Sequence, residues 1–132
     1  MKRILFACTH NAGRSQMAAA FFNQLADPAK ATALSAGTQP TDHVHPVVAT
    51  VMWEVGIDLS TARRQRLTPK LAQRADVLVA MGCGEQCPFV LGVEVVEWES
   101  PDPKDRPVDE VRSIRDEIAK RVRRLVRDRD LS

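Results

Sequence analysis

The chain has 132 residues, a formal net charge of +2, 44% apolar residues and 27% charged residues. This length suits one domain with a buried core and is too short for two. The small net charge argues against nucleic-acid binding, and no apolar run approaches the roughly 20 residues that span a bilayer. We therefore expect a cytoplasmic monomer that binds neither nucleic acid nor membrane.

The first half of the chain alternates apolar runs with turn residues. A short continuous apolar run is typical of a buried strand, and apolar residues three and four positions apart are typical of a helix. Gly13, the pair Asp27-Pro28 and Gly37 interrupt the pattern. The elements expected here are a strand at 3–7, a helix at 15–26, a strand at 31–36 and a helix at 46–55.

The second half begins with a short helix, which Thr68 can cap and which has Pro69 in its first turn. Two apolar strands follow, and a loop rich in Pro and Asp at 100–107 leads to a C-terminal helix with one apolar stripe. The elements expected here are a helix at 69–74, strands at 76–81 and 93–97, and a helix at 108–127.

The alternation of strands and helices predicts the fold class. We expect an α/β protein in which residues 1–132 form a single domain, with a four-stranded parallel sheet and helices on both faces. Ligands of such folds bind at the carboxyl ends of the strands. Cys8 ends the first strand, the segment with Cys83 and Cys87 follows the third, and Asp102 follows the fourth. We therefore expect all of them at one edge of the sheet.

The segment after the first strand has the composition of an oxyanion-binding loop. Successive backbone N–H groups in a tight loop form an anion nest, and a helix N-terminus adds unpaired donors. Arg14 can bind two oxygens, and Ser15 can donate to the sulfur of Cys8, which such positive surroundings favour as a thiolate. The alternative is that Cys8 is a small buried residue and Arg14 a surface charge. The oxyanion-binding residues expected are Cys8, Thr9, His10, Asn11, Ala12, Gly13 and Arg14.

The chain has three cysteines, and a reducing cytosol disfavours structural disulfides. Cys8, Cys83 and Cys87 are therefore expected to be catalytic, redox-active or metal-binding. Cys83 and Cys87 could form half of a zinc site, but no second pair of ligands stands at a useful spacing, because His43 and His45 lie in another loop. We expect no bound metal.

The loop resembles the phosphate-binding loop of the low-molecular-weight protein tyrosine phosphatase fold, in which Cys, five residues, Arg and Ser or Thr follow the first strand. The resemblance implies that Asp102 is a general acid and that Asn11 and Ser35 hydrogen-bond to hold the loop. The alternative, which the resemblance disfavours, is that Asp102 before Pro103 only forms a turn. Further segments that match the family are Ser35 to Thr38, Gly56 to Ser60 and Asp102-Pro103.

The segment Cys83 to Pro88 is similar to that of the thioredoxin-coupled arsenate reductases within this fold. This resemblance implies that Cys8 attacks arsenate, that Cys83 then attacks Cys8, and that Cys87 accepts the disulfide. No cofactor would be bound, and the reductant would be thioredoxin, with glutathione or mycothiol as alternatives. Arg14 to Ala18 and Trp98 also resemble these reductases.

Two departures from the family pattern leave alternatives open. Only three residues separate Cys83 from Cys87, fewer than in the reductases, which affects the final exchange and the choice of reductant. His10 stands where glycine is usual; it could tune the thiolate or simply face solvent. The alternative function is a phosphatase, acting on phosphotyrosine or a small phosphoester through Cys8, Arg14 and Asp102. Lys104 after Asp102-Pro103 and the absence of Tyr disfavour phosphotyrosine.

Overall fold

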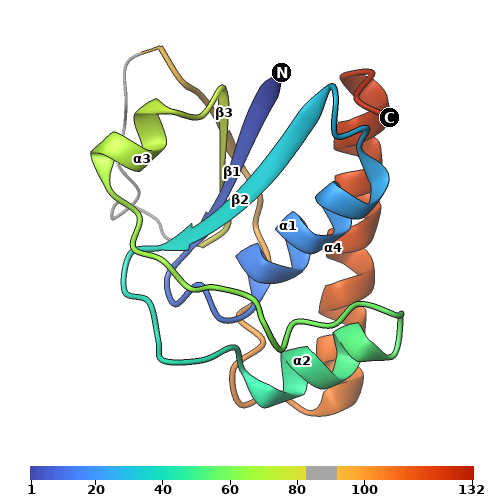
Figure 1. The fold of residues 1–132 in the computed structure, drawn as a ribbon. Helices are drawn as coiled ribbons and strands as arrows, with labels where there is room; N and C mark the ends of the chain where they lie inside the picture. Colours follow the sequence, from blue (N-terminus) through green and yellow to red (C-terminus); the bar gives the residue numbers. More distant parts are fainter. Residues whose placement is uncertain (83–91) are drawn as a thin grey trace.

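The computed structural model describes residues 1–82 and 92–132, which surround a four-stranded parallel sheet. The strands lie in the order β2-β1-β3-β4, and each neighbouring pair is parallel (Figure 1). The expected fold class is therefore confirmed. The strands are β1 (Lys2–Cys8), β2 (Ala31–Gly37), β3 (Val77–Ala80) and β4 (Glu94–Glu97).

Helices cover both faces of this sheet. In Figure 1, α1 and α4 lie together on one face and α3 lies on the other, while α2 packs against α4. Every expected helix and strand is present, with ends within two residues of the expected ones. The helices are α1 (Arg14–Leu25), α2 (Pro46–Trp53), α3 (Pro69–Gln73) and α4 (Val108–Asp128).

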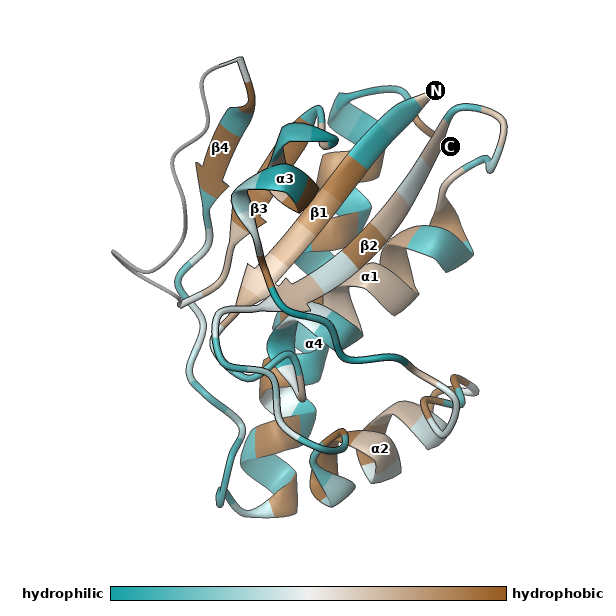
Figure 2. Ribbon diagram, turned by 60° about the vertical axis from the view of Figure 1, so that its left-hand side comes forward, coloured by the Kyte–Doolittle hydropathy of each residue, from teal (hydrophilic) through white to brown (hydrophobic). Residues whose placement is uncertain are grey.

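The apolar core has two layers because side chains of β1 alternate between the faces of the sheet. Ile4 and Phe6 point into the larger layer with α1 and α4, where the Phe6 and Phe22 rings pack edge to face with centroids 6.1 Å apart. Leu5 and Ala7 point into the smaller layer beneath α3. Figure 2 shows the apolar middle of β1 and its polar N-terminal end. Across the described residues, no helix is both long and apolar enough to cross a bilayer.

The segments that follow the strands meet at the carboxyl edge of the sheet. Thr38, after β2, donates its N–H to the carbonyl oxygen of Cys8 at 3.1 Å. Thr9, after β1, donates its hydroxyl to the carbonyl oxygen of Gly82, after β3, at 3.4 Å. Cys83 and Cys87, expected at this edge, lie outside the described residues. The described parts of the edge are nevertheless assembled as the topology requires.

Candidate active site

The loop between β1 and α1 is largely buried, and it carries a row of backbone N–H groups for which the described part of the chain provides no acceptor. Asn11 has a left-handed backbone, with φ of 53°, and residues 11–15 are all buried. Among the hydrogen bonds of the described residues, none is donated by the backbone N–H groups of residues 11–15. Buried N–H groups nearly always have a partner. This pattern is typical of a loop that binds an oxyanion at a helix N-terminus.

Cys8 is buried at the start of this loop, at the end of a short chain of hydrogen bonds. Its Sγ lies 2.9 Å from Ser15 Oγ, which lies 2.9 Å from Asn11 Nδ2. The Asn11 amide donates to the serine oxygen, so the serine hydroxyl hydrogen is available to the sulfur. A donor in this position stabilises a thiolate more than a thiol, because hydrogen bonds to ionised groups are the stronger ones.

Gln65, rather than Ser35, fixes the other end of the Asn11 amide. Asn11 Oδ1 accepts from the backbone N–H of Gln65 at 2.9 Å, and the Gln65 side chain donates to the Ser35 carbonyl oxygen at 2.9 Å. The expected hydrogen bond between Asn11 and Ser35 is thus replaced by a link through Gln65. The reason is that β2 is an edge strand, and the segment around Gln65 runs along its free side.

Two further residues, Gln16 and Gly37, contact the backbone of the loop between β1 and α1. Gln16 donates from Nε2 to the carbonyl oxygens of Asn11 at 3.0 Å and Arg63 at 2.8 Å. A Cβ added to Gly37 would lie 2.7 Å from the carbonyl oxygen of Thr9 and 2.8 Å from the backbone nitrogen of Asn11. Glycine is therefore required where the loop passes over the end of β2.

The Arg14 side chain is buried and joins three segments of the sheet edge. Its Nη1 donates to the carbonyl oxygen of Ser100 at 3.0 Å. Gly82 lies so close that a Cβ added there would be 2.1 Å from the same nitrogen. The guanidinium at the start of α1 thus contacts the chain after both β3 and β4.

The loop with Asp102 packs against the oxyanion loop through Pro103. A Cβ added to Gly13 would lie 2.7 Å from Pro103 Cγ and 3.5 Å from His45 Cδ2. Asp102 Oδ1 accepts from the backbone N–H of Lys104 at 3.0 Å. Asp102 therefore forms the turn that its sequence favours, and that turn stands next to the oxyanion loop.

Two half-buried histidines lie at the rim of the loop. The rings of His10 and His45 meet edge to face, with centroids 6.2 Å apart. Burial lowers the pKa of His45 below its ordinary value; the nearby Asp102 carboxylate opposes this effect and His10 adds to it. His45 therefore holds its proton less tightly than an ordinary histidine does.

Sequence reasoning did not identify Gln65, Ser100 or His45 as neighbours of the site. Gln65 and Ser100 act through backbone groups, N–H and carbonyl respectively, which no residue type signals. Gln16 was also missed, because it follows the polar residues Arg14 and Ser15 at the start of α1 and its residue type does not show that it is buried. Cys8, Arg14, Ser15 and Asp102 are brought to the same edge, as expected.

The family model for low molecular weight phosphotyrosine protein phosphatases matches residues 3–131. The chain belongs to this family. A relative from Halobacterium salinarum, provisionally named an arsenate reductase, is 37% identical over 123 residues, which cover 89% of this chain and 85% of the relative. The glutaredoxin arsenate reductase of Synechocystis is 32% identical, and the match covers 96% of this chain and 97% of the Synechocystis protein.

Solved structures of the family include both reductases and phosphatases. The thioredoxin-dependent arsenate reductase of Corynebacterium glutamicum is 33% identical with a TM-score of 0.82; the match covers 97% of this chain and 61% of that one. An arginine phosphatase of Geobacillus stearothermophilus is 26% identical with a TM-score of 0.82, over 98% of this chain and 94% of its own. The fold therefore accommodates both chemistries.

Proposed function

We propose that this protein is an arsenate reductase that uses Cys8 as its nucleophile and Cys83 and Cys87 as a thiol–disulfide relay. The observation that carries the proposal concerns the backbone N–H groups of residues 11–15: within residues 1–82 and 92–132 none of them donates a hydrogen bond, and the hydroxyl of Ser15, the last of these residues, lies 2.9 Å from the sulfur of Cys8. Relatives named as arsenate reductases and the two further cysteines support reduction over hydrolysis.

In the first step, the Cys8 thiolate attacks the arsenic atom of arsenate. The loop N–H groups and Arg14 bind the oxyanion, and Ser15 stabilises the thiolate. One arsenate oxygen leaves as water after it receives a proton from Asp102, whose loop packs against the oxyanion loop through Pro103. The product of this step is a covalent thiol–arsenate adduct on Cys8.

In the second step, the Cys83 thiolate attacks the sulfur of Cys8. The Cys8–arsenic bond breaks, arsenic(V) takes both electrons of that bond, and it leaves as arsenite while a Cys8–Cys83 disulfide forms. Cys87 then attacks Cys83, which releases Cys8 as a thiolate and leaves a Cys83–Cys87 disulfide. Support for this order comes from Gly82, the residue before Cys83, which contacts both Thr9 and Arg14.

An external dithiol or small thiol must reduce the final disulfide. We propose thioredoxin as the reductant, with glutaredoxin plus glutathione or a mycothiol system as alternatives. The test measures arsenite release with each system in turn, with NADPH and the matching reductase. Turnover with at least one system is expected, and the absence of turnover with every one of them would contradict the proposal.

The relay has its own test, the substitution Cys83→Ser. This variant should bind arsenate normally but release no arsenite, because it lacks the thiol that is proposed to resolve the adduct on Cys8. Any hydrolysis of a small aryl phosphate through Cys8 should persist. If Cys83→Ser instead retains full arsenite release, the relay is wrong; if the wild-type protein hydrolyses aryl phosphates and reduces no arsenate, the phosphatase alternative replaces it.

A further inference from the structure

Two glycines, Gly82 and Gly92, flank the segment that carries Cys83 and Cys87, and they have the same backbone φ angle. Gly82 and Gly92 both have φ of 89°, in the left-handed region that favours glycine. Their surroundings differ completely. A Cβ added to Gly82 would lie 2.1 Å from Nη1 and 2.9 Å from Cζ of Arg14, whereas a Cβ added to Gly92 would meet no atom of the described residues within 4 Å.

The backbone angle favours glycine at both positions, but at position 82 the nearby Arg14 side chain adds a second, steric reason. A carbon atom 2.1 Å from a guanidinium nitrogen is well inside contact distance, so one of the two groups would have to move. Arg14 has a flexible side chain, and its Nη1 donates a hydrogen bond to the carbonyl oxygen of Ser100. Added bulk at position 82 would push the guanidinium off that carbonyl.

We propose that Gly82 is a positioning residue for Arg14. The missing side chain leaves the space in which the guanidinium lies, and Gly82 and Ser100 together hold it beside the oxyanion loop. This inference rests on the proposed function, because it assigns Arg14 to oxyanion binding. It differs from the simpler explanation that Gly82 only lets the Cys83 segment move.

The test compares Gly82→Ala with Gly92→Ala by calorimetric titration with inorganic phosphate and with arsenate. Both variants carry the same backbone strain at an end of the same segment, so Gly92→Ala is a matched control. Gly82→Ala should weaken binding of both anions by about tenfold or more, the size of one lost hydrogen bond to a charged group. Gly92→Ala should leave binding within about twofold of the wild type.

A double variant shows whether the effect acts through Arg14. Lysine has no Nη1, so Gly82→Ala should add little to the loss already caused by Arg14→Lys, and the two effects should not be additive. Should Gly82→Ala alone fail to fold, the double variant is expected to fold, because the clashing atom is gone. Additive losses, or two unfolded proteins beside a folded Gly92→Ala, would overturn the inference.

The remaining outcomes separate this inference from the proposed function. If the wild-type protein binds neither anion, both are overturned. If it binds them and Gly82→Ala binds equally well, the positioning role is wrong while the proposed function stands. If Gly82→Ala slows arsenite release without weakening anion binding, Gly82 serves movement of the cysteine segment, and the role assigned to it here is overturned.

Discussion

Ser15 lies between the sulfur of Cys8 and the amide of Asn11, and it is fully buried. Its hydroxyl accepts from Asn11, so its own hydrogen is directed away from that amide and toward the sulfur. A single residue thus links the group that shapes the loop to the group proposed to react. Because Asn11 also accepts from Gln65, the hydroxyl is oriented by the surrounding structure rather than free to rotate.

The substitution Ser15→Ala should slow alkylation of Cys8 by iodoacetamide at neutral pH by about tenfold. Loss of a hydrogen bond to a charged group costs about 1.5 kcal/mol or more, which corresponds to this factor. Mass spectrometry of the Cys8 peptide separates this reaction from those of the other cysteines. Ser35→Ala is the matched control, because the backbone carbonyl of Ser35 makes its link to Gln65. Equal alkylation rates in Ser15→Ala and the wild type would contradict the role of Ser15.

At the scale of elements, the edge strand β2 and the oxyanion loop share their support. Asn23, in α1, donates to the carbonyl oxygen of Ala33 at 3.0 Å and accepts from its N–H at 2.8 Å. Gln65 binds Ser35 further along the same edge and also holds Asn11. These contacts cover backbone groups that an edge strand would leave exposed. The segment that protects β2 therefore also holds the candidate site in shape.

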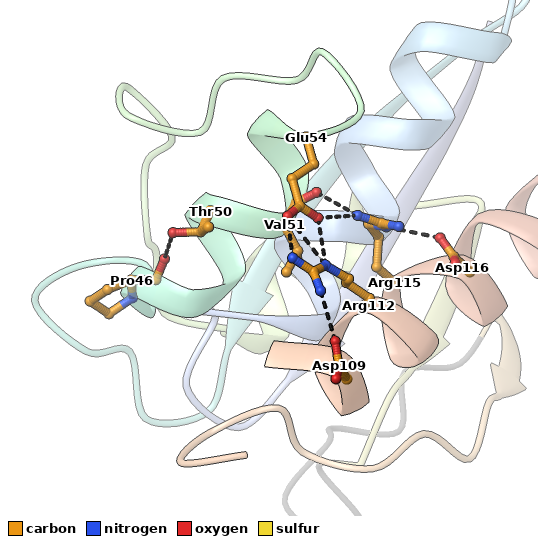
Figure 3. Close-up of polar contacts among 8 residues, drawn as sticks. All are labelled: Pro46, Thr50, Val51, Glu54, Asp109, Arg112, Arg115 and Asp116. Atoms are coloured by element: carbon orange, nitrogen blue, oxygen red, sulfur yellow. Dashed lines mark hydrogen bonds and ion pairs between the residues drawn. The ribbon is translucent and has the colours of Figure 1, made fainter. Parts of the chain in front are cut away.

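Helices α2 and α4 are joined by a cluster of charged side chains, shown in Figure 3. Arg115, in α4, is buried and donates to the carbonyl oxygen of Val51 at 2.8 Å and to Glu54 at 3.0 Å. Val51 lies in the last turn of α2, where carbonyl groups lack partners within the helix. Arg112 also binds Glu54, but its side chain is more exposed. The arginine from α4 thus caps the end of α2.

The substitution Arg115→Met should lower the free energy of unfolding by about 1–3 kcal/mol, because it leaves a buried carbonyl without a donor. Methionine keeps much of the apolar stem, so the change measures the lost hydrogen bonds rather than lost packing. Urea unfolding monitored by circular dichroism gives the value. Arg112→Met is the matched control, since it also removes a contact with Glu54 but uncaps no helix. Equal losses in the two variants would show that the cap contributes nothing.

At the scale of the whole molecule, two sets of ionisable groups link stability to pH. Burial lowers the pKa of His45, so the unfolded chain binds that proton more tightly than the folded one. Hydrogen bonds from Arg112 and Arg129 lower the pKa of Glu54 and Glu94 respectively. All three shifts act in the same direction, because each group binds protons more weakly in the folded protein. Stability should therefore fall as the solution becomes more acidic.

We expect stability to be lost over two separate pH ranges. The contribution of His45 is present above its ordinary pKa of 6.5 and is lost as the pH falls through the lowered value in the folded protein. The contributions of Glu54 and Glu94 are present above 4.5 and are lost as the pH falls further. Urea unfolding between about pH 8 and pH 4 measures the loss in both ranges. His45→Gln should remove the loss of stability in the higher pH range and leave the loss in the lower range. Substitution of the exposed His43 should change neither loss. If the loss in the higher pH range persists in His45→Gln, the assignment to His45 is wrong.

The amino-acid sequence by itself determined the elements, the fold class and the position of the loop between β1 and α1 that we propose binds an oxyanion. Local patterns suffice for these features: β1 is a continuous apolar run, α4 has one apolar stripe, and Gly13 separates Cys8 from the helix that follows. The parallel topology then placed the Asp102 loop at the same edge, because all strands end there. For the described part of the site, the sequence therefore predicted that Cys8, Arg14 and the Asp102 loop lie at one edge of the sheet.

Only the tertiary structure decided which groups hold those side chains in place. Asn11 is bound by Gln65 and not by Ser35, and Arg14 lies between Gly82 and the carbonyl oxygen of Ser100. These partners are backbone groups or a glycine without a side chain, so the residue types in the sequence do not indicate these contacts. They depend on how closely segments far apart in the chain approach one another, which is set by the packing of the whole sheet edge. Residue chemistry thus indicated the groups that we propose react, and the packing of distant segments determined which groups hold them in place.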